Sequence, residues 1–476
     1  MPPRYLYIYT IGCQMNVYDS EHMAMALAPL GYLPALSPGD ADLVIVNTCS
    51  VRSKAEQKAF SILGRLGEAK RLRPGLIVAV AGCVAQQEGA RILARAPHVD
   101  LVFGTRAVHR LADLVRQVES GHRPIVDLEM TDGPEAFEAT PAPAEQGGVS
   151  RFVTIMRGCD NFCAYCVVPH VRGRETSRPP ELILSEIEAL VSAGAREVTL
   201  LGQNVNSYGA KEGLCSFPEL LERVNAIEGL ARIRFTTSHP KDLTEGLIRS
   251  FARLAKLCPH IHLPVQSGSN RILARMNRRY TRDHYLDNVS KLRNSCPGIA
   301  ITSDMIVGFP GETQADFEAT LELVREVQFD GLFAFTYSDR PHAPSTRFPE
   351  KVPARDQSER LQTLLDLQHG ITFARNRALT GSVQEVLAEG FSKQQASRDR
   401  PERAQVQWTG RSPGNKVVNF DGGAGTAGDR EVRAGQLVSV RIERALAHSL
   451  WGALDYGRGS AVTGGGTCCV RSTSPA

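Results

Sequence analysis

The first hundred residues alternate short apolar runs with stretches in which apolar positions recur at helical spacing. The apolar runs cover residues 5–11, 43–46 and 76–81. Strands that alternate with helices usually pair in parallel, because each helix returns the chain to the same end of the sheet. The pattern predicts an N-terminal parallel α/β sheet domain over residues 1–125. Residues 126–149 are rich in Pro, Ala, Glu and Gly, and we expect a linker there.

The middle of the chain repeats the strand-then-helix pattern six times. The predicted strands cover residues 152–156, 197–201, 233–237, 261–265, 299–307 and 332–337. Helical patterns lie between them, for example at residues 181–192, 283–293 and 315–327. Six such units predict a partial (β/α)6 barrel of the TIM type over residues 150–376. Chemistry in such barrels is found at the C-terminal ends of the strands.

The last part of the chain changes to short strand patterns separated by turns. Candidate strands cover residues 383–388, 405–408, 416–419 and 437–442. We therefore expect a small β-barrel over residues 377–456, and barrels of this kind bind oligonucleotides on one face. Residues 457–476 are rich in Gly, Ser and Thr, which is typical of a disordered tail.

Composition narrows the functional classes. The chain has 476 residues, of which 42% are hydrophobic, enough for two or three packed domains. It has no apolar run of about 18 residues that would span a membrane, and its N-terminus lacks the features of an export signal. We expect a cytoplasmic protein. The formal net charge of +4 permits nucleic-acid binding without indicating it.

The odd number of cysteines, eleven, fits metal binding better than a disulfide framework. Cys13, Cys49 and Cys83 each follow one of the N-terminal apolar runs. The C-terminal ends of neighbouring parallel strands meet at one edge of a sheet, so these three thiols can converge. A single cysteine after a strand is more often a small buried residue. Three cysteines in the same topological position favour a metal site.

The strongest motif is CDNFCAYC at residues 159–166, directly after the first barrel strand. Its spacing is C-x3-C-x2-C. Cys159, Cys163 and Cys166 on one loop can hold three irons of a 4Fe-4S cluster and leave the fourth iron open for a ligand. A zinc site completed by His170, or a redox pair of two of these cysteines, is the alternative. Neither alternative explains the six strand-helix units behind the loop.

This motif, with an aromatic residue before its third cysteine, resembles that of the radical S-adenosylmethionine (SAM) superfamily. Within the superfamily, the chain is similar to the tRNA methylthiotransferases of the MiaB type. The segments that carry this narrower resemblance occur in the family's order at residues 12–16, 47–52, 82–89, 156–169, 172–179, 201–208 and 262–268. The resemblance extends to about Leu454 and implies that the C-terminal barrel is a TRAM module.

The resemblance also implies two 4Fe-4S clusters and SAM as cofactors. The barrel loop would hold the cluster that binds SAM, through Cys159, Cys163 and Cys166. The N-terminal domain would hold an auxiliary cluster, on which the methylthio group is assembled, through Cys13, Cys49 and Cys83. One SAM would supply the methyl group. A second would yield a 5′-deoxyadenosyl radical, which removes hydrogen from carbon 2 of an adenine ring.

The implied substrate is N6-isopentenyladenosine next to the anticodon of tRNA, and the implied product is its 2-methylthio derivative. A radical is needed because an aromatic C–H bond is not acidic enough for the general bases that proteins carry. We expect a monomer that receives electrons from a donor such as flavodoxin or ferredoxin. The sequence does not indicate the sulfur source.

Other side chains are weaker candidates. Polar or aromatic residues at the barrel mouth could bind the cofactor, although each could instead cap a turn or cover the cluster: Tyr165, Gln203, Ser238 and Asp304. Basic residues near the mouth are candidates for RNA phosphate contacts: Arg172, Arg174, Arg178, Arg278 and Arg279. The C-terminal module offers a possible stacking surface, although part of any such set is usually core: Trp408, Arg411, Lys416, Phe420 and Arg441.

Two other functions are compatible with parts of the sequence. A sister methylthiotransferase that modifies a ribosomal protein would share both cysteine sites and the barrel. A non-catalytic RNA-binding protein with structural iron or zinc is more distant. Two segments depart from the family pattern, at His170 and at residues 339–343. These departures bear on the substrate rather than on the radical chemistry.

Overall fold

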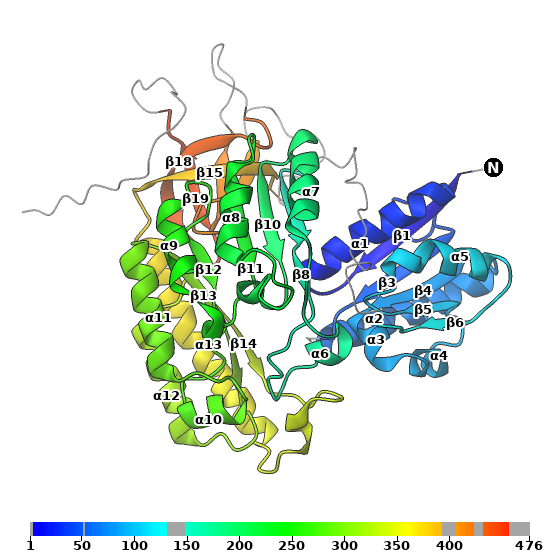
Figure 1. Ribbon diagram of the computed structural model, residues 1–476, viewed down its shortest axis with the longest axis horizontal. Helices are drawn as coiled ribbons and strands as arrows, with labels where there is room; N and C mark the ends of the chain where they lie inside the picture. Colours follow the sequence, from blue (N-terminus) through cyan, green and yellow to red (C-terminus); the bar gives the residue numbers. More distant parts are fainter. Residues whose placement is uncertain (1–2, 51–52, 131–147, 393–405, 423–431, 457–476) are drawn as a thin grey trace, which may run out of the picture.

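Three folded parts follow one another along the chain, in the order that the sequence predicts (Figure 1). The computed structural model describes residues 3–50, 53–130, 148–392, 406–422 and 432–456. Most of the predicted linker and the predicted tail lie outside the described residues. Within the described ranges, no helix has the length and apolar character needed to cross a membrane.

The first part is a parallel sheet of six strands in the order β2-β1-β3-β4-β5-β6. Ile45 and Val46 are neighbours in β3 but lie in two different cores, because successive side chains of a strand point to opposite faces. The strands are β1 (Arg4–Thr10), β2 (Tyr32–Pro34), β3 (Leu43–Thr48), β4 (Ile77–Gly82), β5 (Leu101–Phe103) and β6 (Ile125–Asp127). The helices are α1 (Gln14–Leu27), α2 (Ser53–Leu72), α3 (Cys83–Glu88), α4 (Arg91–Arg95) and α5 (Leu111–Glu119).

Three of these six strands were not predicted from the sequence. β2, β5 and β6 have three residues each, which is too short to produce a recognisable period. β6 ends at Asp127, so the sheet runs past the expected domain boundary at residue 125. The first part is therefore a larger sheet than the three apolar runs indicated.

The second part is an open barrel of parallel strands, which confirms the predicted fold. Its halves have the orders β11-β10-β7 and β12-β13-β14, and a bridge between Ile233 and Leu257 joins them. The strands are β7 (Ser150–Thr154), β10 (Glu197–Leu201), β11 (Arg232–Thr236), β12 (His260–His262), β13 (Ala300–Val307) and β14 (Gly331–Thr336). The outer helices are α7 (Pro180–Ser192), α8 (Phe217–Ala226), α9 (Glu245–Arg253), α11 (Arg282–Ser295), α12 (Gln314–Val327) and α13 (Ala354–Arg377). Shorter elements are β8 (Met156–Arg157), α6 (Val168–Val171), β9 (Thr176–Ser177) and α10 (Asn270–Arg275).

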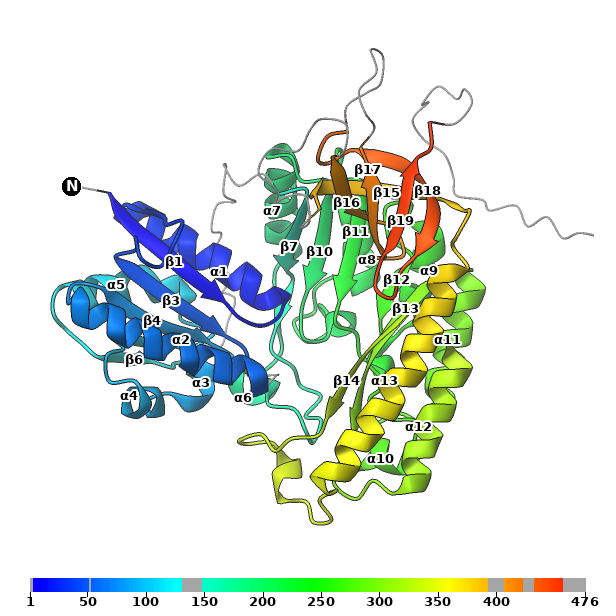
Figure 2. The ribbon, with the colours of Figure 1, turned by 180° about the vertical axis from the view of Figure 1, so that it is seen from behind.

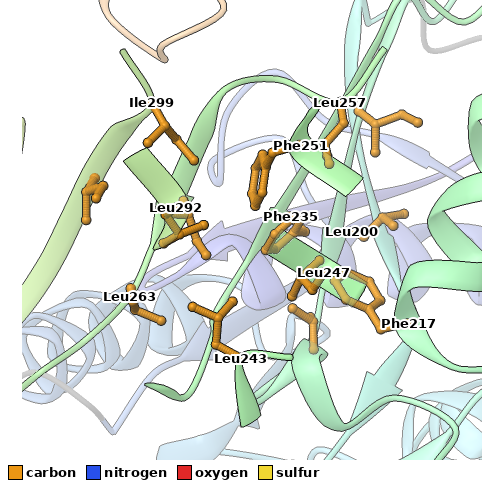
Figure 3. Packing of buried hydrophobic residues seen from close by; sticks show 14 of the residues in the cluster. Leu200, Phe217, Phe235, Leu243, Leu247, Phe251, Leu257, Leu263, Leu292 and Ile299 are labelled. Atoms are coloured by element: carbon orange, nitrogen blue, oxygen red, sulfur yellow. The ribbon is translucent and has the colours of Figure 1, made fainter. Parts of the chain in front are cut away.

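Aromatic packing between the strands and the outer helices holds this barrel together (Figure 3). Phe235 of β11 contacts Phe217 of α8 and Phe251 of α9, with ring centroids 5.1 and 5.8 Å apart. Full burial of such a side chain contributes roughly 1.5–3 kcal/mol. The core therefore fixes the strands, and with them the residues at the strand ends.

The third part is a closed barrel of five strands, which confirms the predicted small β-barrel and adds one strand to the four candidates. Its strands are β15 (Val383–Phe391), β16 (Gln407–Arg411), β17 (Val417–Asp421), β18 (Leu437–Ala445) and β19 (Leu450–Leu454). Arg232 at the start of β11 donates to the carbonyl of Arg411 at 2.6 Å, and Arg234 donates to the carbonyl of Ser412 at 2.8 Å. The C-terminal module therefore docks on the N-terminal ends of the large barrel's strands (Figure 2).

The N-terminal sheet docks on the edge of the large barrel through helix α1 (Figure 2). Glu21 of α1 pairs with Arg151 of β7 at 3.2 Å. Met15 accepts a hydrogen bond from Thr154 at 3.6 Å between oxygen and sulfur. These contacts fix α1 along β7, with Met15 beside the C-terminal end of the strand.

Candidate functional site

The barrel cysteines lie on one loop at the C-terminal end of β7. The backbone of this loop is fastened on both sides: the Ala164 N–H donates to the carbonyl of Met276, and the Ala164 carbonyl accepts from the Ser345 N–H, both at 2.9 Å. Cys163 is buried, while Cys159 and Cys166 are half-buried. Burial raises the pKa of Cys159 to about 11 and that of Cys166 to about 12. The loop thus presents three thiols that ionise when they bind a metal.

Glycine and glutamine shape the start of this loop. Gly158 has a φ of +75°, and a Cβ there would lie 2.1 Å from the carbonyl oxygen of Arg174. Only glycine fits this position without displacing backbone. The Gly158 N–H donates to Oε1 of Gln203, which follows β10. Gln203, a predicted candidate for cofactor binding or for capping a turn, therefore holds the cysteine loop through the oxygen of its side chain.

The N-terminal cysteines follow three adjacent strands. Cys13 follows β1, Cys49 follows β3, and Cys83 begins α3 directly after β4. A hydrogen bond with Cys49 lowers the pKa of Cys13 to about 6. Burial raises the pKa of Cys83, whose thiol lies within electrostatic range of Cys13. The structure thus brings together the three thiols that the strand pattern placed at one edge of the sheet.

A buried asparagine pair supports this second site. Asn16 accepts a hydrogen bond from the Cys13 thiol at 3.3 Å and donates to Asn47 at 2.8 Å and to the Thr48 carbonyl at 3.1 Å. Gly12 has a φ of +144°, and a Cβ there would lie 2.3 Å from Cβ of Cys49. The close approach of the two strand ends therefore requires glycine at residue 12.

A small apolar cluster joins the segments that carry the two cysteine sites. Cys83 packs with Val167, which follows the last cysteine of the barrel loop, and with Val171 and Ala343. Thr105 of the N-terminal domain donates to the carbonyl of Val171 at 2.7 Å. The domain interface therefore holds both sites at the same end of the barrel.

The donor set fits two iron-sulfur clusters. Within the parts of the chain that the structure describes, no three Cys, His, Asp or Glu side chains lie close enough to bind a single metal ion. A four-iron cluster needs a different arrangement, because each thiolate binds its own iron at a corner of the cluster. Each site offers three thiols, which can bind three of the four irons of one cluster.

Several polar atoms at the barrel mouth are buried without a hydrogen-bond partner among the described residues. They are Asn206 Oδ1, Ser238 Oγ and His239 Nε2. His239 Nδ1 accepts from the Lys241 N–H at 3.3 Å, so Nε2 carries the proton of the neutral ring. Burial, with the nearby cations Arg278 and Lys241, lowers the pKa of His239 to about 2. These atoms fit a polar ligand such as SAM.

The remaining predicted cofactor residues have defined positions. Tyr165 is half-buried and its hydroxyl accepts from Arg278 at 3.3 Å. Asp304 lies within β13 rather than after it, and alternates with core residues of that strand, so it lies on the inner face of the barrel. Its carboxylate is 3.4 Å from His262 Nε2. Sequence reasoning missed His239 because a lone histidine carries no positional signal.

Most of the predicted RNA contacts need correction. Five of them are buried or bound within the protein: Arg172 to Asp19, Arg178 to Glu186, Arg278 to Cys163 and Tyr165, Lys416 to Asp330, and Trp408 in the core of the C-terminal barrel. Phe420 is also core. Arg441 is exposed and Arg411 half-buried, each beside a carboxylate, so these two stay predictions. Long cationic side chains can bury their charge wherever a partner is present, and sequence spacing does not reveal the partner.

Two of the predicted arginines remain accessible beside the cysteine loop. Arg279 is exposed, and Arg174 is exposed while pairing with Asp160 at 2.7 Å. The Arg174 guanidinium also lies over the ring of Phe162, 5.1 Å from its centroid. Phe162 is 39% exposed, so its ring is accessible beside the cysteine loop. Phe162 was not among the predicted site residues, although its position inside the cysteine motif could have indicated it.

The two departures from the family pattern meet in space. His170 of α6 and His342 of the segment after β14 have ring centroids 5.5 Å apart. Burial, with His342 as a second cause, lowers the pKa of His170. The departures therefore form one contact next to Ala343 and Val171 of the apolar cluster.

The sequence and the fold of this chain are similar to those of known proteins. A family model described as "Radical SAM superfamily" matches residues 153–324, and one described as "Uncharacterized protein family UPF0004" matches residues 5–104. The solved structure of the radical SAM methyltransferase TsrM from Kitasatospora setae is similar in fold. Its TM-score is 0.55 at 14% identity, and the match covers 84% of this chain and 82% of that one.

Relatives with much higher identity share a single name, tRNA-2-methylthio-N(6)-dimethylallyladenosine synthase. One from Desulfosudis oleivorans is 55% identical over 447 residues, which cover 94% of this chain and 96% of that protein. One from Geobacter metallireducens is 51% identical over 450 residues, which cover 94% of this chain and 98% of that protein. The chain therefore belongs to the family of tRNA-2-methylthio-N(6)-dimethylallyladenosine synthases within the radical SAM superfamily.

Proposed function

We propose that this protein attaches a methylthio group to carbon 2 of N6-isopentenyladenosine next to the anticodon of tRNA. It is a transferase that uses two 4Fe-4S clusters and SAM. The sister activity on a ribosomal protein receives no support from the names of the relatives. The observation that carries the proposal is the pair of cysteine sites, whose segments pack together in one apolar cluster through Cys83 and Val167.

The chemistry divides between the cofactors and the chain. A 4Fe-4S cluster with an open iron supplies, when bound, the electron that cleaves SAM into a hydrogen-removing radical. Cys159, Cys163 and Cys166 would hold this cluster, and Cys13, Cys49 and Cys83 would hold the auxiliary one. The chain binds and orients the substrates and keeps water out.

Specific side chains fit these tasks. Ser238 and His239 offer a hydroxyl and a neutral ring N–H to polar atoms of SAM, because Ser238 Oγ and His239 Nε2 have no hydrogen-bond partner in the described structure. Tyr165 lies inside the cysteine loop, where its ring can cover the cofactor. The inner face of the barrel, with Asp304 and His262, forms the shielded wall of the reaction space.

Access for RNA lies at the outer side of the same loop. Arg174 and Arg279 are exposed there and can contact phosphates, and Phe162 can stack on a base of an opened-out anticodon loop. RNA recognition of single-stranded loops commonly combines stacking and phosphate contacts in this way. We also propose that the protein acts as a monomer in the cytoplasm and takes electrons from a flavodoxin or ferredoxin.

The decisive experiment is a single reaction with defined components. The protein is reconstituted without oxygen with iron and sulfide. It is then incubated with reductant, SAM and tRNA carrying N6-isopentenyladenosine. Digested nucleosides are analysed by mass spectrometry, with tRNA that lacks the isopentenyl group as the control substrate. We expect the 2-methylthio product from the first tRNA. Formation of 5′-deoxyadenosine with no change in either tRNA would contradict the substrate assignment and keep the radical site.

A further inference from the structure

Arg278 is a buried cation without a carboxylate partner in the described part of the chain. Its side chain follows α10 and is 4% exposed. Among the described residues, no Asp or Glu oxygen lies within 4.0 Å of its nitrogens. Other buried arginines of the barrel do have such partners: Arg234 pairs with Glu197 at 2.8 Å, and Arg172 pairs with Asp19 at 2.9 Å. An arginine stays charged at any ordinary pH, so the charge of Arg278 needs another counter-ion.

The hydrogen bonds of Arg278 point to the cysteine loop. Nε donates to the Tyr280 hydroxyl at 2.9 Å, and one terminal nitrogen donates to the Pro264 carbonyl at 2.6 Å. The other terminal nitrogen donates to the Tyr165 hydroxyl at 3.3 Å and to the Cys163 sulfur at 3.4 Å. Four of its five N–H groups are thus engaged, and Cys163 is the one partner that becomes an anion when it binds metal.

The charge of a bound cluster completes this arrangement. A 4Fe-4S cluster held by three thiolates carries a net negative charge, and one-electron reduction adds another. A fixed cation in hydrogen-bond contact with one ligand sulfur stabilises the reduced form more than the oxidised form. Hydrogen bonds to sulfur and nearby charge are the means by which proteins set cluster potentials.

We propose that Arg278 is a positioning residue that balances the charge of the barrel cluster and raises its reduction potential. The proposal rests on the proposed function, since it requires a cluster on Cys159, Cys163 and Cys166. Arg278, a predicted candidate for an RNA phosphate contact, thus has a role toward the cluster instead. Arg279, its exposed neighbour, has no contact with a thiol among the described residues.

The test measures the potential of one cluster directly. Cys13, Cys49 and Cys83 are changed to Ala in the full chain, so that only the barrel site takes a cluster on anaerobic reconstitution. The midpoint potential is determined without SAM by redox titration with electron paramagnetic resonance. The variants Arg278→Gln and Arg278→Lys are compared with this background. Arg279→Gln removes one charge at the neighbouring position and serves as the matched control.

We expect Arg278→Gln to lower the equilibrium constant for reduction at least tenfold, a shift of about 59 mV for one electron. Arg278→Lys restores part of the shift because it keeps the charge. Arg279→Gln leaves the potential unchanged. Equal potentials in Arg278→Gln and the background overturn the proposal, as does an equal shift in Arg279→Gln. An unchanged potential combined with weaker SAM binding also overturns it, because the cation then serves the SAM carboxylate.

Loss of the cluster is also informative. If Arg278→Gln binds no cluster and Arg278→Lys does, the cation is needed to hold the anionic cluster and the proposal stands. If both variants lose the cluster, Arg278 is a structural residue and the proposal fails. A background protein that itself binds neither iron nor labile sulfide contradicts the proposed function instead. Iron and sulfide analysis of the background therefore separates the two failures.

Discussion

The two cysteine sites are built on different principles. The barrel thiols come from one loop of eight residues. Hydrogen bonds of Ala164 with Met276 and Ser345, and of the preceding Gly158 with Gln203, fasten this loop. The N-terminal thiols come from three strand ends, and the register of the sheet brings them together. The first site is thus specified locally, and the second depends on the fold of a whole domain.

The buried arginines beside the two sites differ in how their charge is balanced. Arg172, within electrostatic range of Cys13 and Cys83, is neutralised by Asp19 across the domain interface. Arg278, in contact with Cys163, has no carboxylate partner in the described structure. The first charge is balanced before any cofactor binds. The charge of Arg278 is left for the bound cluster to balance. The Arg172 pair therefore stabilises the fold, whereas Arg278 acts on the cofactor.

The largest expected effect comes from removing one cysteine from each site. Cys159→Ala should abolish both 5′-deoxyadenosine and the methylthio nucleoside, because the radical site is lost. Cys83→Ala should abolish the methylthio nucleoside but keep 5′-deoxyadenosine. Each variant should lose about four of about eight irons. Chromatography of the products together with iron analysis tests the separation, and a Cys83→Ala protein that makes no 5′-deoxyadenosine would show that the sites are not independent.

The next effect tests the neutralised arginine. Asp19→Asn leaves Arg172 as a buried charge without its carboxylate, so the free energy of unfolding of the cluster-free protein should fall by roughly 3–5 kcal/mol. Urea denaturation measures the change. Asp113→Asn is the matched control, because Asp113 pairs with Arg116 on the surface. That variant should differ from the wild type by less than about 0.5 kcal/mol. Equal losses of stability in Asp19→Asn and Asp113→Asn would show that Asp19 does not balance a buried charge.

A smaller effect tests the local support of the barrel loop. Gln203→Ala leaves the Gly158 N–H without its acceptor, which should lower stability by roughly 1–3 kcal/mol. The barrel cluster should be lost preferentially, while the auxiliary cluster stays. Gln314→Ala, on the exposed side of α12, is the control. Iron analysis of variants with only one cysteine site intact distinguishes the two clusters. Loss of the auxiliary cluster instead would contradict local specification.

The last effect depends on pH. Burial raises the pKa of Glu175, near the barrel loop, to about 7, against an opposing hydrogen bond from Ser207. Its pKa in the unfolded chain is about 4.3. Folding therefore takes up a proton between these values, and stability falls as pH rises through this window. Glu175→Gln removes this dependence, so its stability relative to wild type should increase from about pH 4.3 to about pH 7. Thermal denaturation across this range measures the difference, and a difference independent of pH would contradict the raised pKa.

The sequence predicted the fold well where one signal was repeated. Six strand-helix units and three strand-end cysteines were each visible because the same pattern recurs along the chain. β5, β6 and β19 were missed because a short or terminal strand gives no period of its own. Their presence depends on pairing with strands that are distant in the sequence.

The side chains around the site were harder to predict than the site itself. Arg172, Arg178 and Arg278 have the composition of a surface patch, yet tertiary contacts bury all three. Trp408 looked like a stacking residue and instead fills the core of the C-terminal barrel. A charge or an aromatic ring is compatible with either environment, and only the partner decides between them.

The position of the C-terminal module has a consequence for the shape of the substrate. The module docks on the starts of the barrel strands, and the cysteine loop lies beyond their ends. A strand such as β13, with eight residues, separates these ends by about 26 Å. An RNA that touches both the module and the reaction site must span this length. For such an RNA, the length of the barrel strands sets the distance between the target base and the part of the RNA that contacts the module.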